Sequence, residues 1–173
     1  MREPEKYEYI PHHKVVELVG KDGFMPELRK IAGQTKQVNQ LVPDLMYGIN
    51  YKQRDSLRLY MVEIDCKTEQ VKKTEKNPYR TFENKLDRYS RFIGGGLYKE
   101  EMGISGGVML QTITTNAGHM RELVGLVPDK KYMLFNYLDS FDWGFVPPKE
   151  PFTLFEEPWI CPGIGHFHIN STD

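Results

Sequence analysis

The chain has few cysteines, no long apolar run and almost no net charge, and each of these features excludes a class of protein. Its 173 residues include only two cysteines, Cys66 and Cys161, which stand far apart in the sequence. Such a pair is not a disulfide framework and is typical of a reducing compartment. No apolar run approaches the roughly 20 residues that a membrane-spanning helix needs. We therefore expect an intracellular, cytoplasmic protein with no membrane partner.

The near absence of net charge also limits the interactions of the chain. Its 23 basic and 24 acidic residues almost cancel, so any contact with nucleic acid has to be local. The N-terminal segment "MREPEKYEY" is charged and lacks the apolar core of a signal peptide. With 39% apolar and 12% aromatic residues, the composition is that of a folded protein. We expect a single domain, with a core over residues 1–138 and an irregular Trp- and Pro-rich extension over 139–173 packed on it, with room for a short extra strand.

The order of strand and helix patterns predicts an α/β fold with a mixed central sheet flanked by helices. The strand "LRLYMVEIDC", from Leu57 to Cys66, has apolar residues on both faces, which predicts a central position in the sheet. The segment "PDLMYGINYK" before it alternates like a partner strand, so the two form a hairpin. The other predicted elements are weak helical patterns within 11–41, a helix from Phe82 to Ile93, a strand over 107–115, a helix over 116–127 and a strand over 130–138.

Charged residues gather where this hairpin begins and ends. Glu63, Asp65 and Lys67 alternate at the end of the second strand, so they share one face. Asp44 opens the first strand, and the hairpin brings it next to Asp65 and Lys67. Hard cations such as Mg²⁺ prefer oxygen ligands and often use only one or two carboxylates with water and a substrate phosphate. The pattern therefore predicts a site for Mg²⁺ or Mn²⁺, although a solvated rim of charges explains the same residues.

Pro43-Asp44 and Asp65-Cys66-Lys67 resemble the PD-(D/E)xK signature of the restriction-endonuclease-like nuclease superfamily. The resemblance implies an αβββαβ core and a divalent-metal-dependent phosphodiesterase that acts on DNA. It implies that Asp44 and Asp65 bind the metal, with Glu63 as an added ligand. Lys67 would then orient the attacking water or stabilise the charge that develops on phosphorus. Glu17, on the first helical segment, matches the upstream acid that some members of the superfamily use.

A narrower resemblance covers more of the chain. "LVPDL", "YMVEIDCKTEQ", "ENKLDRYSRFI" and "EEPW" are similar to the replication-relaxation family of plasmids and related mobile elements. The matching positions are Glu63, Asp65, Thr68, Lys85 and Tyr89. The likeness implies a role in replication or mobilisation of a plasmid, phage or mobile element, with Lys85 near the catalytic site. Members usually carry a winged-helix segment before this part, so we expect a separate DNA-binding subunit or domain; a homo-oligomer is compatible with the sequence.

The segment before and within the helix from Phe82 also offers contacts to a phosphate backbone. Arg80, Arg88 and Tyr89 lie in "YRTFENKLDRYSR", where basic and aromatic residues alternate with acids. This composition suits nucleic-acid binding, and it suits an ordinary solvated helix face equally well.

Two alternatives remain open at the level of the sequence. Cys161, His166 and His168 fall within "CPGIGHFH", which favours a structural tail over zinc because no second ligand pair is near in the sequence. The second alternative concerns function, since a fold does not fix an activity. The chain is then a non-catalytic DNA-processing accessory or a protein-docking module that keeps the nuclease fold.

Overall fold

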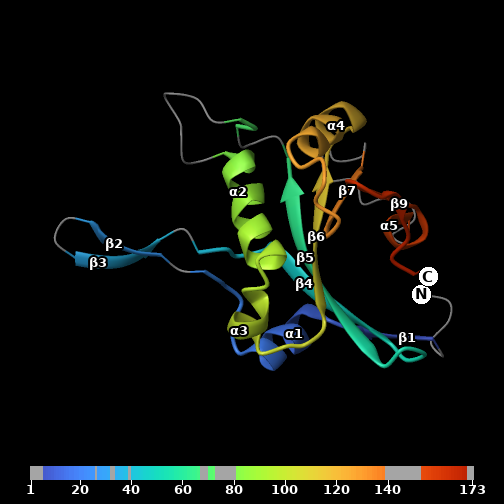
Figure 1. Cartoon of the computed structure of the whole chain (residues 1–173), viewed down its shortest axis with the longest axis horizontal. Coiled ribbons are helices and arrows are strands. Elements are labelled where there is room, and N and C mark those ends of the chain that lie inside the picture. The colour runs from blue at the N-terminus through green and yellow to red at the C-terminus, as the bar shows by residue number, and fades with distance from the viewer. Residues whose placement is uncertain are drawn as a thin grey trace.

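One mixed sheet of seven strands forms the centre of the protein, and most of the helices cover one of its faces (Figure 1). The computed structural model describes residues 6–25, 40–66, 70–72, 81–138 and 155–170, and the backbone alone for 27–31, 34–38 and 153–154. The strand order is β1-β4-β5-β6-β7-β8-β9. The bounds of these strands are β1 Tyr7–Ile10, β4 Leu45–Tyr51, β5 Ser56–Asp65, β6 Gly107–Thr114, β7 Met133–Tyr137, β8 Trp159–Cys161 and β9 Gly165–Phe167.

The centre of the sheet is parallel and its flanks are antiparallel. Strand β5 pairs with β6, and β6 with β7, in parallel, whereas β1, β4 and β5 pair antiparallel, as do β7, β8 and β9. The parallel pairs are joined by helices, as parallel neighbours require. The predicted α/β fold with a mixed sheet is therefore confirmed, including the hairpin of β4 and β5 and the central position of β5.

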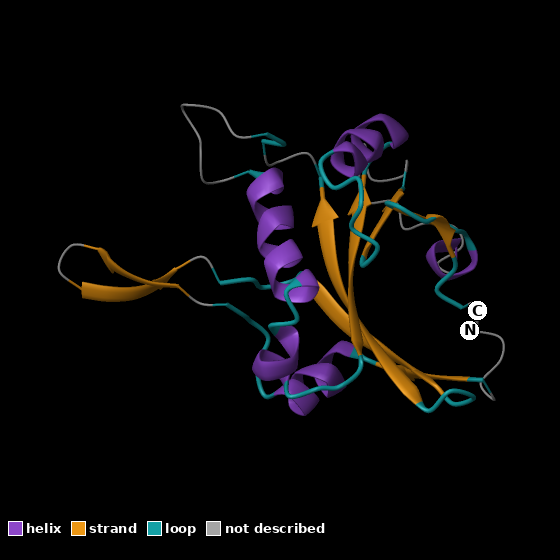
Figure 2. Ribbon diagram, in the orientation of Figure 1, coloured by secondary structure: helices purple, strands orange, loops and turns teal. Residues whose placement is uncertain are grey.

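The helices lie on the face of the sheet that Leu59, Met61 and Leu110 occupy (Figure 2). Apolar residues from the helices close a core with this face, among them Val15, Leu86 and Leu123. The helical elements on this side are α1 His12–Val19, α2 Phe82–Tyr89, the π-helical turn η1 Ser90–Gly94, α3 Tyr98–Met102 and α4 Ala117–Gly125. Together they place the first turns of α2 and α4 near the edge at which β5 and β6 end (Figure 1).

The opposite face of the sheet is rich in tyrosine and is covered by the C-terminal segment. Trp159 and Ile169 belong there to the same buried cluster as the aromatic residues of β4 and β5. The Tyr51 hydroxyl donates to the Ile169 carbonyl at 2.8 Å, and the Tyr7 hydroxyl donates to the Asn170 carbonyl. This second core joins the first described strand to the last described residues.

Two sequence-based expectations differ from the structure. The segment "MPELRKIAG" was expected to be helical, but Glu27–Ile31 forms strand β2, which pairs with β3, Gln34–Val38. The segment from 139 was expected to be irregular with room for one short extra strand, and residues 153–170 hold helix α5, Thr153–Glu156, and two strands, β8 and β9. Both differences come from pairing between strands, which short apolar runs do not reveal. None of the described helices has the length and apolar character needed to cross a membrane.

Helix α2 begins at a capping residue that the chain supplies just before it. The Thr81 hydroxyl accepts a hydrogen bond from the Asn84 amide at 3.2 Å, and Glu83 follows in the first turn. Thr81→Ala is expected to lower the free energy of unfolding by about 1 kcal/mol, because it leaves an amide at the helix start without a partner. Urea denaturation measures this change. Thr81→Ser keeps the hydroxyl and should restore most of the stability; an equal loss in both variants would contradict the capping role.

Candidate functional site

The candidate site lies where the parallel strands β5 and β6 end side by side. Glu63 is in register with Thr112, and Asp65 with Thr114. These residues share the face that carries the helices, because they continue the every-second-residue series of Leu59 and Met61 in β5 and of Leu110 in β6. In open α/β sheets, ligands bind at the carboxyl ends of parallel strands. The location of the acidic residues is therefore that of a binding site in such folds.

Glu63 forms the centre of the site. Its side chain is 4% exposed, and one carboxylate oxygen, Oε2, accepts from Lys85 Nζ at 3.0 Å. The other oxygen, Oε1, accepts from the Tyr89 hydroxyl at 2.6 Å. Lys85 and Tyr89 are one turn apart on α2, so a single helix face supplies both donors. We call Glu63, Lys85 and Tyr89 the Glu63 cluster; these three positions are among the five that carry the narrower family resemblance.

Burial and hydrogen bonding act in opposite directions on this carboxylate. Desolvation raises the pKa of Glu63 above its ordinary value, and the donors Lys85 and Tyr89 lower that pKa in part. Burial also raises the pKa of Tyr89 well above its ordinary value, and the neighbouring Glu63 raises it further. Burial of the ionised Glu63 carboxylate therefore costs desolvation free energy. Carboxylates with a pKa perturbed in this way are common at functional sites.

Asp44 lies beside Glu63 rather than opposite Asp65. Leu45 pairs with Val62, so the antiparallel register brings Asp44 opposite Glu63. Asp44 Oδ2 accepts from the Ile64 amide at 2.8 Å, and the negative charge of Asp44 contributes to the raised pKa of Glu63. The expected neighbourhood of Asp44 and Asp65 is thus shifted by two residues along β5. The alternation of apolar residues predicted which side chains of β4 and β5 share a face. It did not predict the register in which the two strands pair.

Asp65 pairs with a residue that the sequence analysis missed. Its Oδ2 lies 2.6 Å from His119 Nε2, and the two side chains are 2% and 6% exposed. The Thr114 hydroxyl donates to the Asp65 backbone carbonyl at 3.0 Å, and Glu122 Oε2 lies 3.7 Å from His119 Nδ1. His119 is in the first turn of α4, which follows directly after β6. A histidine just after a predicted parallel strand was the available signal, because such strands end at one edge.

Two threonine hydroxyls at the same edge have no hydrogen-bond partner. Thr112 and Thr115 are buried, and the Oγ1 atom of each is among the described side-chain atoms that lack one. Thr112 is the register partner of Glu63. Since buried polar groups are nearly always hydrogen-bonded, unsatisfied hydroxyls are typical of places that receive water or a ligand.

Several expected site residues have other contacts than expected or lie away from the site. Tyr89 is fully buried with its hydroxyl on Glu63, so its expected contact with nucleic acid is wrong. Arg88 Nη2 is directed to the Met25 carbonyl at 3.5 Å. Glu17 is exposed on α1, where it pairs with Lys14 at 2.8 Å, far from the end of β5 (Figure 1). Lys67, Thr68 and Arg80 lie outside the described residues.

The donor atoms suit a sparsely ligated divalent cation. Among the described residues, no three His, Cys, Asp or Glu side chains are close enough to hold a metal ion together. Mg²⁺ often uses one or two carboxylates and completes its shell with water and phosphate. The carboxylates of Asp44 and Glu63, from adjacent strands, and the unsatisfied hydroxyl of Thr112 provide oxygen atoms of the right kind.

The zinc alternative has no support in the geometry of the tail. Cys161 is buried in the tyrosine-rich core, and its thiol donates to the Lys131 carbonyl at 3.3 Å. His166 pairs with Ile160 in the β8–β9 register, so it lies on the opposite face from Cys161. His168 is exposed. The expectation of a structural tail therefore fits the arrangement better than a metal centre.

Comparison with known proteins leaves the site to be interpreted from its chemistry. No protein-family model, no curated protein and no solved structure matches the chain.

Proposed function

We propose that the protein is a divalent-metal-dependent phosphodiesterase that acts on DNA, with its site at the Glu63 cluster and Asp44. One observation carries the proposal: a buried carboxylate at the carboxyl edge of the parallel strands is held by a lysine and a tyrosine from the crossover helix. Such an arrangement combines a negative centre for a cation with a positive group for a phosphate. The sequence resemblance to PD-(D/E)xK nucleases is a separate argument for the same chemistry.

Each residue of the site has a role that follows from its position. Asp44 and Glu63 would hold Mg²⁺ or Mn²⁺, which supplies charge stabilisation at phosphorus and a more acidic bound water. The Lys85 side chain is 29% exposed, so it is in contact with solvent while its ammonium group pairs with Glu63. It can therefore stabilise a phosphate that approaches from solvent. Tyr89 keeps the Glu63 carboxylate in one orientation. Asp65, which pairs with His119, supports the edge beside it.

A second function is favoured by a specific observation. Both oxygens of Glu63 already accept hydrogen bonds, and the described residues contain no group of three metal-binding side chains. This arrangement also suits a non-catalytic DNA-processing or docking module, in which the Glu63 cluster only stabilises the fold. The two functions differ in whether the protein binds a metal and cleaves DNA.

Metal binding and cleavage separate the two functions directly. We expect the purified protein to bind Mn²⁺ in calorimetry and to cleave or nick DNA with Mg²⁺ or Mn²⁺ but not with EDTA. Asp44→Asn should weaken Mn²⁺ binding by about 10-fold or more, because it removes one anionic ligand. Asp55→Asn, in the exposed turn between β4 and β5, is the matched control and should behave like the wild type. Absence of both metal binding and cleavage on single- and double-stranded DNA would favour the docking module.

A further inference from the structure

Strands β2 and β3 form a two-stranded ribbon that stands away from the rest of the protein (Figures 1 and 2). The ribbon is a separate antiparallel sheet, with Glu27–Ile31 paired to Gln34–Val38. An isolated two-stranded ribbon is at best marginally stable in water, because it has no core of its own. Its projection from the body therefore suggests a partner.

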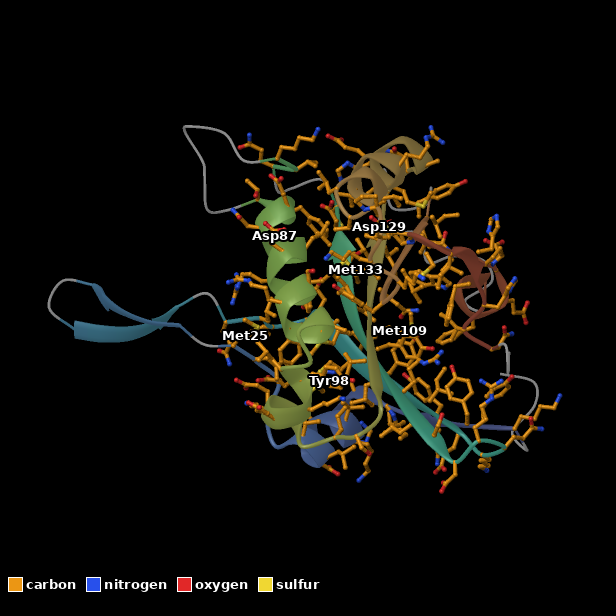
Figure 3. The ribbon with its side chains drawn as sticks, in the orientation of Figure 1. Met25, Asp87, Tyr98, Met109, Asp129 and Met133 are labelled. Carbon is orange, nitrogen blue, oxygen red and sulfur yellow. The ribbon has the colours of Figure 1, made fainter. Side chains whose placement is uncertain are left out.

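The base of the ribbon is firmly attached to the core. Phe24 and Leu41 exchange backbone hydrogen bonds of 2.8 and 2.7 Å just before β2 and just after β3, and both side chains are buried. The Phe24 ring lies 5.2 Å from that of Phe92. Arg88 of α2 reaches the carbonyl of Met25, which lies between the ribbon and the helix (Figure 3). The ribbon is thus anchored to the helix that supplies two members of the Glu63 cluster.

The charges along the ribbon are almost all positive. Arg29 is in register with Lys36, and Lys30 is the next residue of β2. The only acidic residue in the two strands is Glu27, at the end nearest the body. Like charges at directly opposed positions destabilise a strand pair. A register that opposes arginine to lysine on a marginal ribbon is a local conflict, and such conflicts are expected at functional sites.

A bound polyanion would neutralise the opposed positive charges and so stabilise the ribbon. The dimensions of the ribbon indicate what shape of polyanion it can bind. Two paired strands lie only about 4.8 Å apart, and a five-residue strand is about 17 Å long, so the ribbon is narrow as well as extended. The major groove of B-DNA, about 12 Å wide, admits a two-stranded ribbon between its two phosphate backbones. Lysine and arginine on DNA phosphates release counterions, which drives binding without sequence preference. Duplex DNA therefore fits both the charge and the dimensions of the ribbon.

We propose that the β2–β3 ribbon binds duplex DNA through the charges of Arg29, Lys30 and Lys36. The base of the ribbon contacts α2 through Arg88, and the same helix carries Lys85 and Tyr89 of the Glu63 cluster. The proposal rests on the proposed function for the choice of DNA as partner, and it adds the surface that binds it. It also assigns the contact with DNA to a segment other than the Arg88 and Tyr89 face of α2.

Binding without cleavage tests this assignment. Fluorescence anisotropy with a short labelled duplex in EDTA measures the affinity and its salt dependence. Arg29→Gln combined with Lys36→Gln is expected to raise Kd about 10-fold or more at roughly 100 mM salt and to lower the salt slope by about 1.8, or 0.9 per lost phosphate contact. The matched control is Arg54→Gln combined with Lys99→Gln, which removes two charges from exposed positions on the body. This control should bind like the wild type.

The outcomes separate this proposal from the proposed function. Unchanged affinity in the ribbon variant, an equal loss in the control, or a loss confined to single-stranded DNA would each overturn the role of the ribbon, whether or not the protein cleaves. A selective loss supports the ribbon even when no cleavage is found with Mg²⁺. Arg29→Lys combined with Lys36→Arg keeps the charges and should bind like the wild type. Equal loss in this variant would show that ribbon structure, not charge, is responsible, which contradicts the proposal.

Discussion

Glu63→Gln is expected to reduce DNA cleavage by about 100-fold or more while the protein stays folded. Glutamine has nearly the same volume as glutamate, and its amide oxygen can still accept from the Tyr89 hydroxyl. The negative charge that faces Lys85 and the cation is lost. Removal of even an outer-shell partner of a metal site costs about 10- to 100-fold in affinity or activity, and Glu63 is proposed to hold the metal itself. Initial rates of plasmid nicking and calorimetric Mn²⁺ titration measure the effect.

A second ion pair, on a different helix, provides the control for this variant. Glu101 of α3 pairs with Lys21, and its side chain is 29% exposed. Glu101→Gln also neutralises one carboxylate that faces a lysine, but it lies on a different element. Its cleavage rate should equal that of the wild type. Wild-type cleavage in Glu63→Gln, with thermal unfolding unchanged, would exclude Glu63 from the catalytic site.

Tyr89→Phe is expected to lower the free energy of unfolding by about 1.5 to 3 kcal/mol at neutral pH. The hydroxyl donates to a buried carboxylate at 2.6 Å, and hydrogen bonds to charged groups contribute roughly that amount. Both side chains are buried, so the Glu63 oxygen loses a donor that sits within the protein interior. Urea denaturation followed by fluorescence measures the change. Tyr132→Phe removes a hydroxyl that bonds the neutral Ser90 at 2.9 Å, and we expect a smaller loss of about 0.5 to 1.5 kcal/mol.

The loss in Tyr89→Phe should also depend on pH in a defined direction. In the wild type, burial raises the pKa of Glu63 in the folded state above its ordinary value of 4.5. The folded state therefore binds this proton more tightly than the unfolded state, and stability falls as the pH rises through the folded pKa. The Tyr89 hydrogen bond lowers the folded-state pKa of Glu63. Removal of this bond therefore extends the decrease in stability to higher pH. The difference between variant and wild type should shrink as the pH falls through the two raised folded-state pKa values and should be small by about pH 4.5, and a pH-independent difference would contradict the role of the ionised carboxylate.

The hairpin of β4 and β5 was predictable because its signals are local and agree with one another. Alternation in "LMYGINY" and two-sided apolar character in "LRLYMV" both follow from burial in the centre of a sheet. The helix from Phe82 was predictable from its apolar period, although its last turn is the π-helical η1. These elements carry Glu63, Lys85 and Tyr89, so the sequence named the residues of the cluster.

What the sequence did not reveal depends on pairing over long distances. The contact of Asp65 with His119 joins residues 54 apart, and no periodic pattern encodes it. The register of the hairpin, which moved Asp44 from Asp65 to Glu63, depends on the turn at 52–55 as well as on the alternation. The ribbon of β2 and β3 has mixed polar strands, whose composition resembles that of a surface helix. In each case, tertiary contacts decide what the local sequence leaves open.

The position of Ile169 and Trp159 has a consequence for the order in which the chain can assemble. The tyrosine-rich face belongs to strands made early, β1, β4 and β5, but its cover belongs to residues 159–170. The Tyr7 hydroxyl reaches Asn170 across a sequence separation of 163 residues. Contacts of such high contact order form late, because the loop must close first. On the ribosome, the face of the sheet that carries α1 to α4 can therefore pack before synthesis ends. The tyrosine-rich face stays uncovered until the last described residues emerge.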